Sequence, residues 1–111
     1  MAGPGERRLR VIQWASGSVG RAAMAAVLDR PDLELVGCWV HSPDKDGIDI
    51  GTLAGRPRAG VAATNDAESL LALDADCVLY SPLFADPSVV ERILASGKNV
   101  VTPLGWFYPP A

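Results

Sequence analysis

Near the N-terminus, a short run of small residues has the types and spacing needed to bind a phosphate group. A β-branched apolar segment precedes the run and an alanine-rich segment follows it, which predicts a strand, a tight turn and a helix. Ala15, Gly17 and Gly20 occupy the three glycine positions of a G-x-G-x-x-G pattern, in which the backbone of the turn approaches a pyrophosphate. The N–H groups and the positive dipole end of the helix, near Ser18 and Val19, would face the anion.

The positions in this turn have separate expected roles. Gly17 would let the main chain approach the phosphates without an intervening Cβ, and Gly20 would let the helix pack closely on the strand. Ala15 departs from the pattern and would cost about 1–2 kcal/mol if the turn needs a left-handed backbone there. Arg21 would either assist at the phosphate or lie in solvent, and the alternative for the whole segment is a turn without a ligand. The candidate cofactor-binding residues of the turn are Ala15, Ser16, Gly17, Ser18, Val19, Gly20 and Arg21.

A second group of candidate residues follows the strand predicted at 33–40. In the dinucleotide-binding fold, a carboxylate at this point binds the adenosine ribose and repels a 2′-phosphate. Here no carboxylate occurs before Asp44, whereas His41, Ser42 and Lys45 offer a ring, a hydroxyl and a positive charge. Two hydrogen bonds from such residues to a 2′-phosphate, each contributing about 1.5–3 kcal/mol, would strongly favour a ligand that carries this phosphate. We therefore expect NADP(H) to bind at least as well as NAD(H); the alternative is a solvated loop.

The nicotinamide half of the same ligand would lie across the carboxyl ends of the first, fourth and fifth strands. Two proline-containing segments, 81–83 and 102–104, fall there, which makes Ser81, Pro82 and Thr102 candidate contacts. The prolines suit sharp exits from the strands and remove no donor within them. The alternative is that both segments form turns and contact no ligand.

Composition narrows the class of protein. The chain has 111 residues, enough for one domain, and its 49% hydrophobic and 21% charged residues are ordinary for a globular fold and argue against disorder. Its net charge of −3 leaves no basic surplus for nucleic acid. Cys38 and Cys77 fall in predicted buried strands and one histidine is present, so we expect no metal site and a reducing, cytoplasmic location. No apolar run approaches the roughly 20 residues of a membrane span.

The order of the predicted elements is that of an α/β protein. Strands and helices alternate, which calls for a parallel sheet with right-handed crossovers. By analogy with dinucleotide-binding folds, we expect a single domain with a Rossmann-type doubly wound parallel sheet of about five strands, in the order 3-2-1-4-5. Strands are expected at 9–14, 33–40, 60–63, 77–81 and 99–102, helices at 19–29, after 65 and after 86, and one helical turn within 52–58.

Several residues predict where these helices begin and end. Asn65 and Glu68 form a capping pair, which predicts a helix start. Asp86 followed by Pro87 predicts another start, and Gly97 a stop. Pro31 is predicted to end the first helix. One face of this helix is predicted to hold Val19, Ala23, Ala26, Val27 and Arg30, with Met24 and Leu28 flanking it.

Three segments together resemble the N-terminal domain of dihydrodipicolinate reductase-like proteins: residues 11–21, His41–Ser42 and 97–103. The similarity is to the actinobacterial branch with diaminopentanoate dehydrogenase-like and amine dehydrogenase-like members, and it spans nearly the whole chain. Members of this family are NAD(P)-dependent oxidoreductases with a C-terminal domain that binds substrate and mediates oligomerisation. The resemblance implies the following organisation: a flexible leader at 1–8, a dinucleotide-binding domain at 9–103, and a tail at 104–111 that leads to an absent substrate domain.

The resemblance also implies an activity. The full-length parent would transfer hydride between a nicotinamide cofactor, NADP or NAD, and a carbon–nitrogen substrate of the imine, amine or dihydrodipicolinate type. This chain alone would bind the cofactor without turnover, because the segment after Thr102 holds no Asp, Glu, His or Lys to serve as acid or base. Exposed tail aromatics and an uncovered fifth strand favour a homo-oligomer. The alternative is a non-catalytic nucleotide-sensing or interaction module with the same fold.

Overall fold

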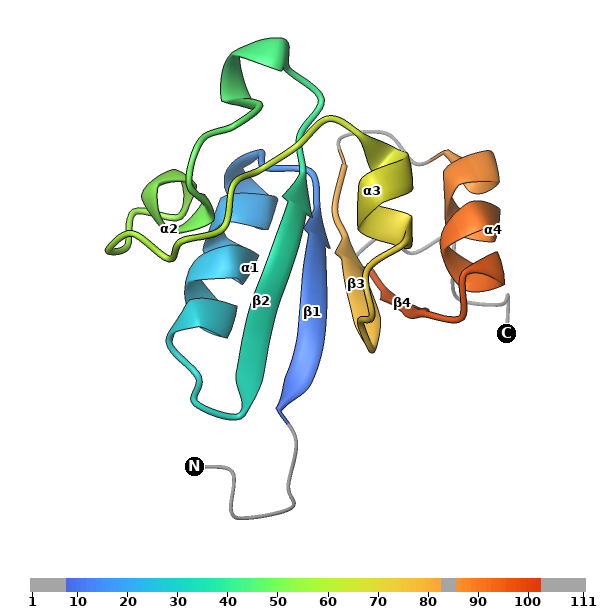
Figure 1. Ribbon diagram of the computed structural model, residues 1–111, viewed down its shortest axis with the longest axis horizontal. Helices are drawn as coiled ribbons and strands as arrows, with labels where there is room; N and C mark the ends of the chain where they lie inside the picture. The colour runs from blue at the N-terminus through green and yellow to red at the C-terminus, as the bar shows by residue number, and fades with distance from the viewer. Residues whose placement is uncertain (1–7, 83–85, 103–111) are drawn as a thin grey trace.

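The computed structural model describes residues 8–82 and 86–102, so residues 1–7 of the predicted leader and the predicted tail at 104–111 lie outside the described residues. The described chain forms one parallel sheet of four strands in the order β2-β1-β3-β4 (Figure 1). The elements are β1 (Leu9–Trp14), α1 (Ser18–Leu28), β2 (Leu33–Trp39), the short 3-10 helix η1 (Pro43–Lys45), α2 (Ile50–Leu53), α3 (Ala67–Leu71), β3 (Cys77–Tyr80), α4 (Pro87–Ala95) and β4 (Asn99–Val101).

Helices pack on both faces of the sheet, which makes it doubly wound (Figure 1). On one face, Val11 of β1 belongs to a buried cluster with Met24 of α1. On the other face, Ile12 belongs to a buried cluster with Val90 and Ile93 of α4. Successive residues of a strand point to opposite faces, so the apolar residues of β1 contribute to both cores. The predicted α/β doubly wound fold is confirmed.

The strand predicted at 60–63 does not form, and the sheet has four strands where about five were expected. Only isolated bridges occur in this region: Ala62 lies opposite Asp49, antiparallel, and Thr64 opposite Trp39, parallel. The loop folds back around Asp49, whose carboxylate accepts three backbone N–H groups, so its polar groups are bound locally instead of in a ladder. The Thr64 bridge nevertheless lies beside β2, where the order 3-2-1-4-5 places the third strand.

The buried face of the first helix is displaced from the predicted one, although Val27 belongs to both. Gly20, Met24 and Val27 are buried, at the i, i+4 and i+7 spacing of one helical face, whereas Val19 is 57% exposed. The face is shifted by one residue because Gly20, the residue without a side chain, is the one that the helix presses against the preceding turn. The predicted limits of the helix agree with α1 to within one residue.

The two predicted helix starts have different outcomes. At α4 the prediction is confirmed: the carboxylate of Asp86 accepts the N–H of Ser88 at 3.0 Å. At α3 it is wrong by one residue, because Asp66 and not Asn65 accepts the N–H of Glu68, at 3.1 Å. The backbone of Asn65 is bound on both sides to other segments, which leaves the next residue to begin the helix.

Candidate functional site

The three positions of the glycine pattern in the turn between β1 and α1 differ in backbone conformation and in the space around them. Ala15 has a φ of +86°, in the left-handed region that favours glycine. Gly17, just before α1, faces open space, because a Cβ built on it would meet nothing within 4 Å. A Cβ on Gly20 would lie 2.3 Å from the carbonyl oxygen of Ala15, so the helix approaches the turn too closely for a larger residue. The left-handed backbone considered for Ala15 is therefore present.

The N-terminus of α1 is open beside this turn. Its N-cap residue, Gly17, has no side chain to accept a hydrogen bond, and the first turn of the helix carries no acidic residue. The N–H groups of Ser18 and Val19 are among the first four of the helix, which have no intrahelical acceptor. Together with the positive end of the helix dipole, they form a surface that favours an anion.

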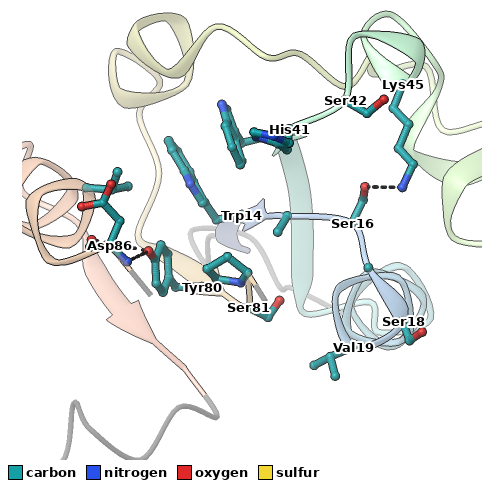
Figure 2. A pocket seen from close by; sticks show the side chains of 15 residues that line it. Trp14, Ser16, Ser18, Val19, His41, Ser42, Lys45, Tyr80, Ser81 and Asp86 are labelled. Atoms are coloured by element: carbon teal, nitrogen blue, oxygen red, sulfur yellow. Dashed lines mark hydrogen bonds between the residues drawn. The ribbon is translucent and has the colours of Figure 1, made fainter. Parts of the chain in front are cut away.

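The turn is one wall of a cleft of about 900 Å³ at the carboxyl ends of β1, β2 and β3 (Figure 2). The chain proceeds from β1 to β2 in one direction across the sheet and from β3 to β4 in the other. The cleft therefore lies where the strand order reverses, the position at which doubly wound sheets bind ligands. Most of the predicted residues line it: Ala15, Ser16, Gly17, Ser18, Val19, His41, Ser42, Lys45, Ser81 and Pro82.

Three predicted residues do not line the cleft. Gly20 is buried behind the turn, against the carbonyl of Ala15. Arg21 is exposed on the first turn of α1, and its Nε donates to the carbonyl oxygen of Leu53 in α2 at 3.0 Å. Thr102 lines a smaller apolar groove of about 350 Å³ beside α1, together with Val19 and Ser81.

Lys45 links the segment after β2 to the turn. Its Nζ donates to Oγ of Ser16 at 3.2 Å, across the end of β2 (Figure 2). Ser42 is the N-cap of η1, and its Oγ accepts the N–H of Asp44 at 3.3 Å. Ser16, Ser42 and Lys45 all line the cleft, and the ammonium group of Lys45 contacts the hydroxyl of Ser16. The sequence predicted Lys45 and Ser42 as a group, and the fold adds Ser16 to it.

An aromatic wall lies beside these polar groups. Trp14 and Trp39 end the adjacent strands β1 and β2 and stack with their ring centroids 5.3 Å apart and their planes at 11°. His41 follows at 5.9 Å from Trp39, tilted by 56°. The side chains of Val89 and Pro82 line the same cleft. Sequence reasoning missed this wall, although a tryptophan at the end of each of two neighbouring parallel strands is a readable signal.

Gln13 is a second feature that the sequence analysis did not identify as functional. Its side chain is fully buried, one residue before the cleft. Nε2 donates to the carbonyl oxygen of Ala15 at 3.0 Å and to Oγ of Ser81 at 2.6 Å. The amide therefore joins the turn after β1 to the end of β3. The available signal was a polar residue between Ile12 and Trp14, in the apolar part of the strand.

The end of β3 is held against the start of α4 by Tyr80 and Asp86. The N–H of Asp86 donates to the phenol oxygen of Tyr80 at 2.8 Å (Figure 2). Hydrogen bonds from the hydroxyl and the backbone N–H of Ser88 lower the pKa of Asp86, so this carboxylate is ionised at neutral pH. Burial raises the pKa of Tyr80, which keeps the phenol protonated. Both side chains shape the cleft and are unsuited to proton exchange near neutral pH.

In the part of the chain that the structure describes, neither cysteine is activated as a thiolate and no cluster of metal-ligating side chains is formed. Burial raises the pKa of the Cys38 thiol to about 12, and burial also raises that of Cys77, so neither is a thiolate at neutral pH. Within residues 8–82 and 86–102, no group of three or more His, Cys, Asp or Glu side chains is placed to hold a metal ion. No helix in the same ranges is long and apolar enough to cross a membrane.

Among solved structures, the fold is similar to that of an amine dehydrogenase from Mycobacterium smegmatis, with a TM-score of 0.73 and 31% identity over 85% of this chain and 29% of that one. It is also similar to GenD2 from gentamicin A biosynthesis, solved in complex with NAD, with a TM-score of 0.71 and 22% identity over 92% of this chain and 28% of that one. At that identity, the second likeness concerns the fold alone.

The sequence matches extend over most of the chain. It is 37% identical over 101 residues to an amine dehydrogenase from Streptomyces virginiae, and the match covers 86% of this chain but 28% of that protein. The chain thus spans less than a third of the length of this relative. Residues 11–102 match the family model for the N-terminus of dihydrodipicolinate reductase. The chain therefore belongs to the family of dihydrodipicolinate reductase N-terminal domains.

Proposed function

We propose that the cleft binds NADP(H) at least as well as NAD(H). The observation that carries the proposal is the cradle at Gly17, where backbone without a Cβ borders open space beside the uncapped N-terminus of α1. A pyrophosphate needs such a surface, because backbone N–H groups can approach its oxygens there and the helix dipole favours its charge. NAD in the structurally similar GenD2 supports this assignment.

The residues above β2 support the preference for NADP(H). Ser16, Ser42 and Lys45 present two hydroxyls and an ammonium group at the cleft wall where the adenosine ribose of a dinucleotide would lie. A 2′-phosphate takes hydrogen bonds from both hydroxyl and ammonium donors. Since each hydrogen bond to a charged group contributes about 1.5–3 kcal/mol, loss of Lys45 alone should change the affinity for NADPH markedly.

The aromatic wall supports the placement of the adenine. Trp39 and His41 line the cleft next to the proposed phosphate donors. An adenine ring has a π-face that stacks on such side chains, and stacking on aromatic residues contributes about 1–3 kcal/mol per base. The nicotinamide half would then extend toward Ser81 and Pro82, at the end of β3.

Membership of the family supports a domain plan and an activity for the whole protein. We propose that residues 9–103 are the cofactor-binding domain of a longer oxidoreductase, and that the tail at 104–111 leads to a substrate domain. The parent enzyme would act on an imine, amine or dihydrodipicolinate-like substrate. When bound, the nicotinamide supplies or accepts the hydride, while the residues of this chain bind and orient the cofactor. The proposed location is the cytoplasm.

A homo-oligomer is proposed for the same protein. β4 is an edge strand of the described sheet, and Val101 on it is 53% exposed. An exposed edge strand with an apolar side chain favours pairing with another copy. Sedimentation at increasing concentration tests this, and a monomer at every concentration would contradict it.

Titration of the 111-residue chain with NADPH and with NADH, by calorimetry and by tryptophan fluorescence, tests the cofactor proposal. We expect binding of both, quenching of the tryptophan emission, and an affinity for NADPH equal to or greater than that for NADH. The Trp106→Phe variant removes the third tryptophan, so that the signal comes from Trp14 and Trp39. Absence of binding would refute the proposal, and tenfold tighter binding of NADH would refute the NADP(H) preference.

A further inference from the structure

We infer that Gln13 is a positioning residue that directs the hydroxyl proton of Ser81 into the cleft, so that Ser81 donates a hydrogen bond to the nicotinamide half of the cofactor. This inference rests on the proposed function. It assigns a role to a side chain that does not line the cleft and to a hydroxyl that does.

The orientation of the buried amide follows from its neighbours. The side chain of Gln13 approaches the backbone carbonyl oxygen of Ala15 to 3.0 Å. A carbonyl oxygen only accepts, so the amide atom facing it must be the nitrogen and not the oxygen. The same nitrogen is 2.6 Å from Oγ of Ser81. Its two hydrogens are thus used by one carbonyl and one hydroxyl, and the amide cannot be turned over without placing two acceptors against each other.

This orientation determines what Ser81 can do. Because Ser81 accepts a hydrogen bond from Gln13, the single hydroxyl proton of Ser81 must point elsewhere. The backbone at Ser81 is also held, since its N–H donates to the carbonyl oxygen of Trp14 at 3.1 Å. Within the described residues, no acceptor for the hydroxyl proton is present, and Ser81 lines the cleft. The hydroxyl is therefore prepared to donate to a ligand oxygen.

The cost of keeping a glutamine at this position supports a role beyond packing. Gln13 is 0% exposed in the middle of the sheet, and its Oε1 is buried without a hydrogen-bond partner in the described structure. A buried unsatisfied oxygen lowers stability, and an apolar residue of similar length would avoid that loss. An apolar residue would lack the N–H groups with which Gln13 binds both the carbonyl oxygen of Ala15 and the hydroxyl of Ser81.

The position of Ser81 selects the half of the ligand that it contacts. Ser81 follows β3, which lies on the far side of β1 from β2, whereas Lys45 comes after β2 and contacts Ser16 in the turn after β1. In a doubly wound sheet the two halves of a dinucleotide lie on opposite sides of the point where the strand order reverses. Ser81 is therefore expected to contact the nicotinamide half and to leave the adenosine half unaffected.

Calorimetric titrations of two ligands test the inference: NADPH, which has both halves, and adenosine 2′,5′-bisphosphate, which has only the adenosine half. We expect Ser81→Ala to weaken NADPH binding about tenfold and to leave adenosine bisphosphate binding within about twofold. Ser81→Thr, which keeps the hydroxyl, should retain most of the affinity. Gln13→Met, which removes the donor at similar length, should weaken NADPH binding at least as much as Ser81→Ala.

The double variant Gln13→Met/Ser81→Ala shows whether Gln13 affects NADPH binding through Ser81. If Gln13 acts through Ser81, adding Ser81→Ala to Gln13→Met causes little further loss, because the aligned hydroxyl is already lost. The inference is overturned if Ser81→Ala binds NADPH as the unmodified chain does, or if the two losses multiply. Ser81→Ala leaves the core intact, so its result stands even if Gln13→Met does not fold. An unmodified chain that binds neither ligand refutes the proposed function, and this inference with it.

Discussion

Replacing Gly20 by alanine should destabilise the domain through a clash between α1 and its own preceding turn. The added Cβ would lie 2.3 Å from the carbonyl oxygen of Ala15 and 3.0 Å from Nε2 of Gln13. Non-bonded heavy atoms prefer separations of about 3.5–4.0 Å, so the helix must move away from the turn by about 1 Å. Overpacking costs about 1–3 kcal/mol, and the clash with rigid backbone favours the upper end of that range.

The net magnitude includes one opposing effect. Alanine has a higher helix propensity than glycine by about 1 kcal/mol. Subtracting this from a cost of about 3 kcal/mol leaves a net loss of about 2 kcal/mol in the free energy of unfolding. For a domain of this size, that loss lowers the Tm by about 8–16 °C. Thermal unfolding followed by circular dichroism measures it, and an unchanged Tm would refute the packing argument.

Gly17→Ala is the matched control, because the same Cβ at residue 17 meets nothing within 4 Å. Its backbone φ is −68°, which any residue adopts, so we expect a stability change of only about 0.5 kcal/mol. The Cβ would instead occupy the space through which a phosphate approaches the backbone, and NADPH binding should weaken about 10- to 100-fold. Unchanged binding by a stable Gly17→Ala variant would refute the proposed pyrophosphate site.

Three further predictions concern single residues. Lys45→Met should weaken NADPH binding about 10- to 100-fold and leave NADH binding within about twofold in calorimetry; equal losses would contradict the 2′-phosphate assignment. Ala15→Gly should relieve about 1–2 kcal/mol of left-handed strain and cost about 0.5–1 kcal/mol in chain entropy, so the Tm should rise, not fall. Backbone N–H groups, chiefly that of Ala59, lower the pKa of Asp49. The Asp49→Asn variant should therefore have a lower free energy of unfolding than the unmodified chain at neutral pH, and this difference should shrink as the pH falls below about 4. Urea titrations at several pH values measure the difference, and a difference that does not change with pH would contradict the prediction.

Local signals in the sequence predicted the strand-turn-helix unit, the cap at Asp86 and the helix stop at Gly97, which has a φ of +90°. These features depend on the residue itself and its immediate neighbours: a side chain that accepts a nearby N–H, or a missing Cβ that permits a positive φ. The glycine pattern of the turn is a local signal of the same kind, because a residue without a Cβ lets another group come close to the backbone.

Features that depend on competition between segments were predicted less well. The expected third strand reduced to bridges because Asp49 binds the loop backbone locally, and the α3 cap moved by one residue because Asn65 is bound elsewhere. Arg21 is exposed, as one of its two predicted alternatives required, but the acceptor of its Nε, the carbonyl oxygen of Leu53, lies 32 residues along the chain. A sequence pattern does not show which distant segment will supply the acceptor.

By itself, the sequence determined the class of fold, the turn at the first strand end and the polar group after the second. Each is encoded by periodicity, by residue size or by short-range hydrogen bonding. Only the tertiary structure decided that Lys45 reaches Ser16, that Trp14 stacks on Trp39, and that the buried amide of Gln13 joins two strand ends. These contacts arise because parallel strands distant in sequence end at the same edge of the sheet, and side chains there meet only after the sheet has formed.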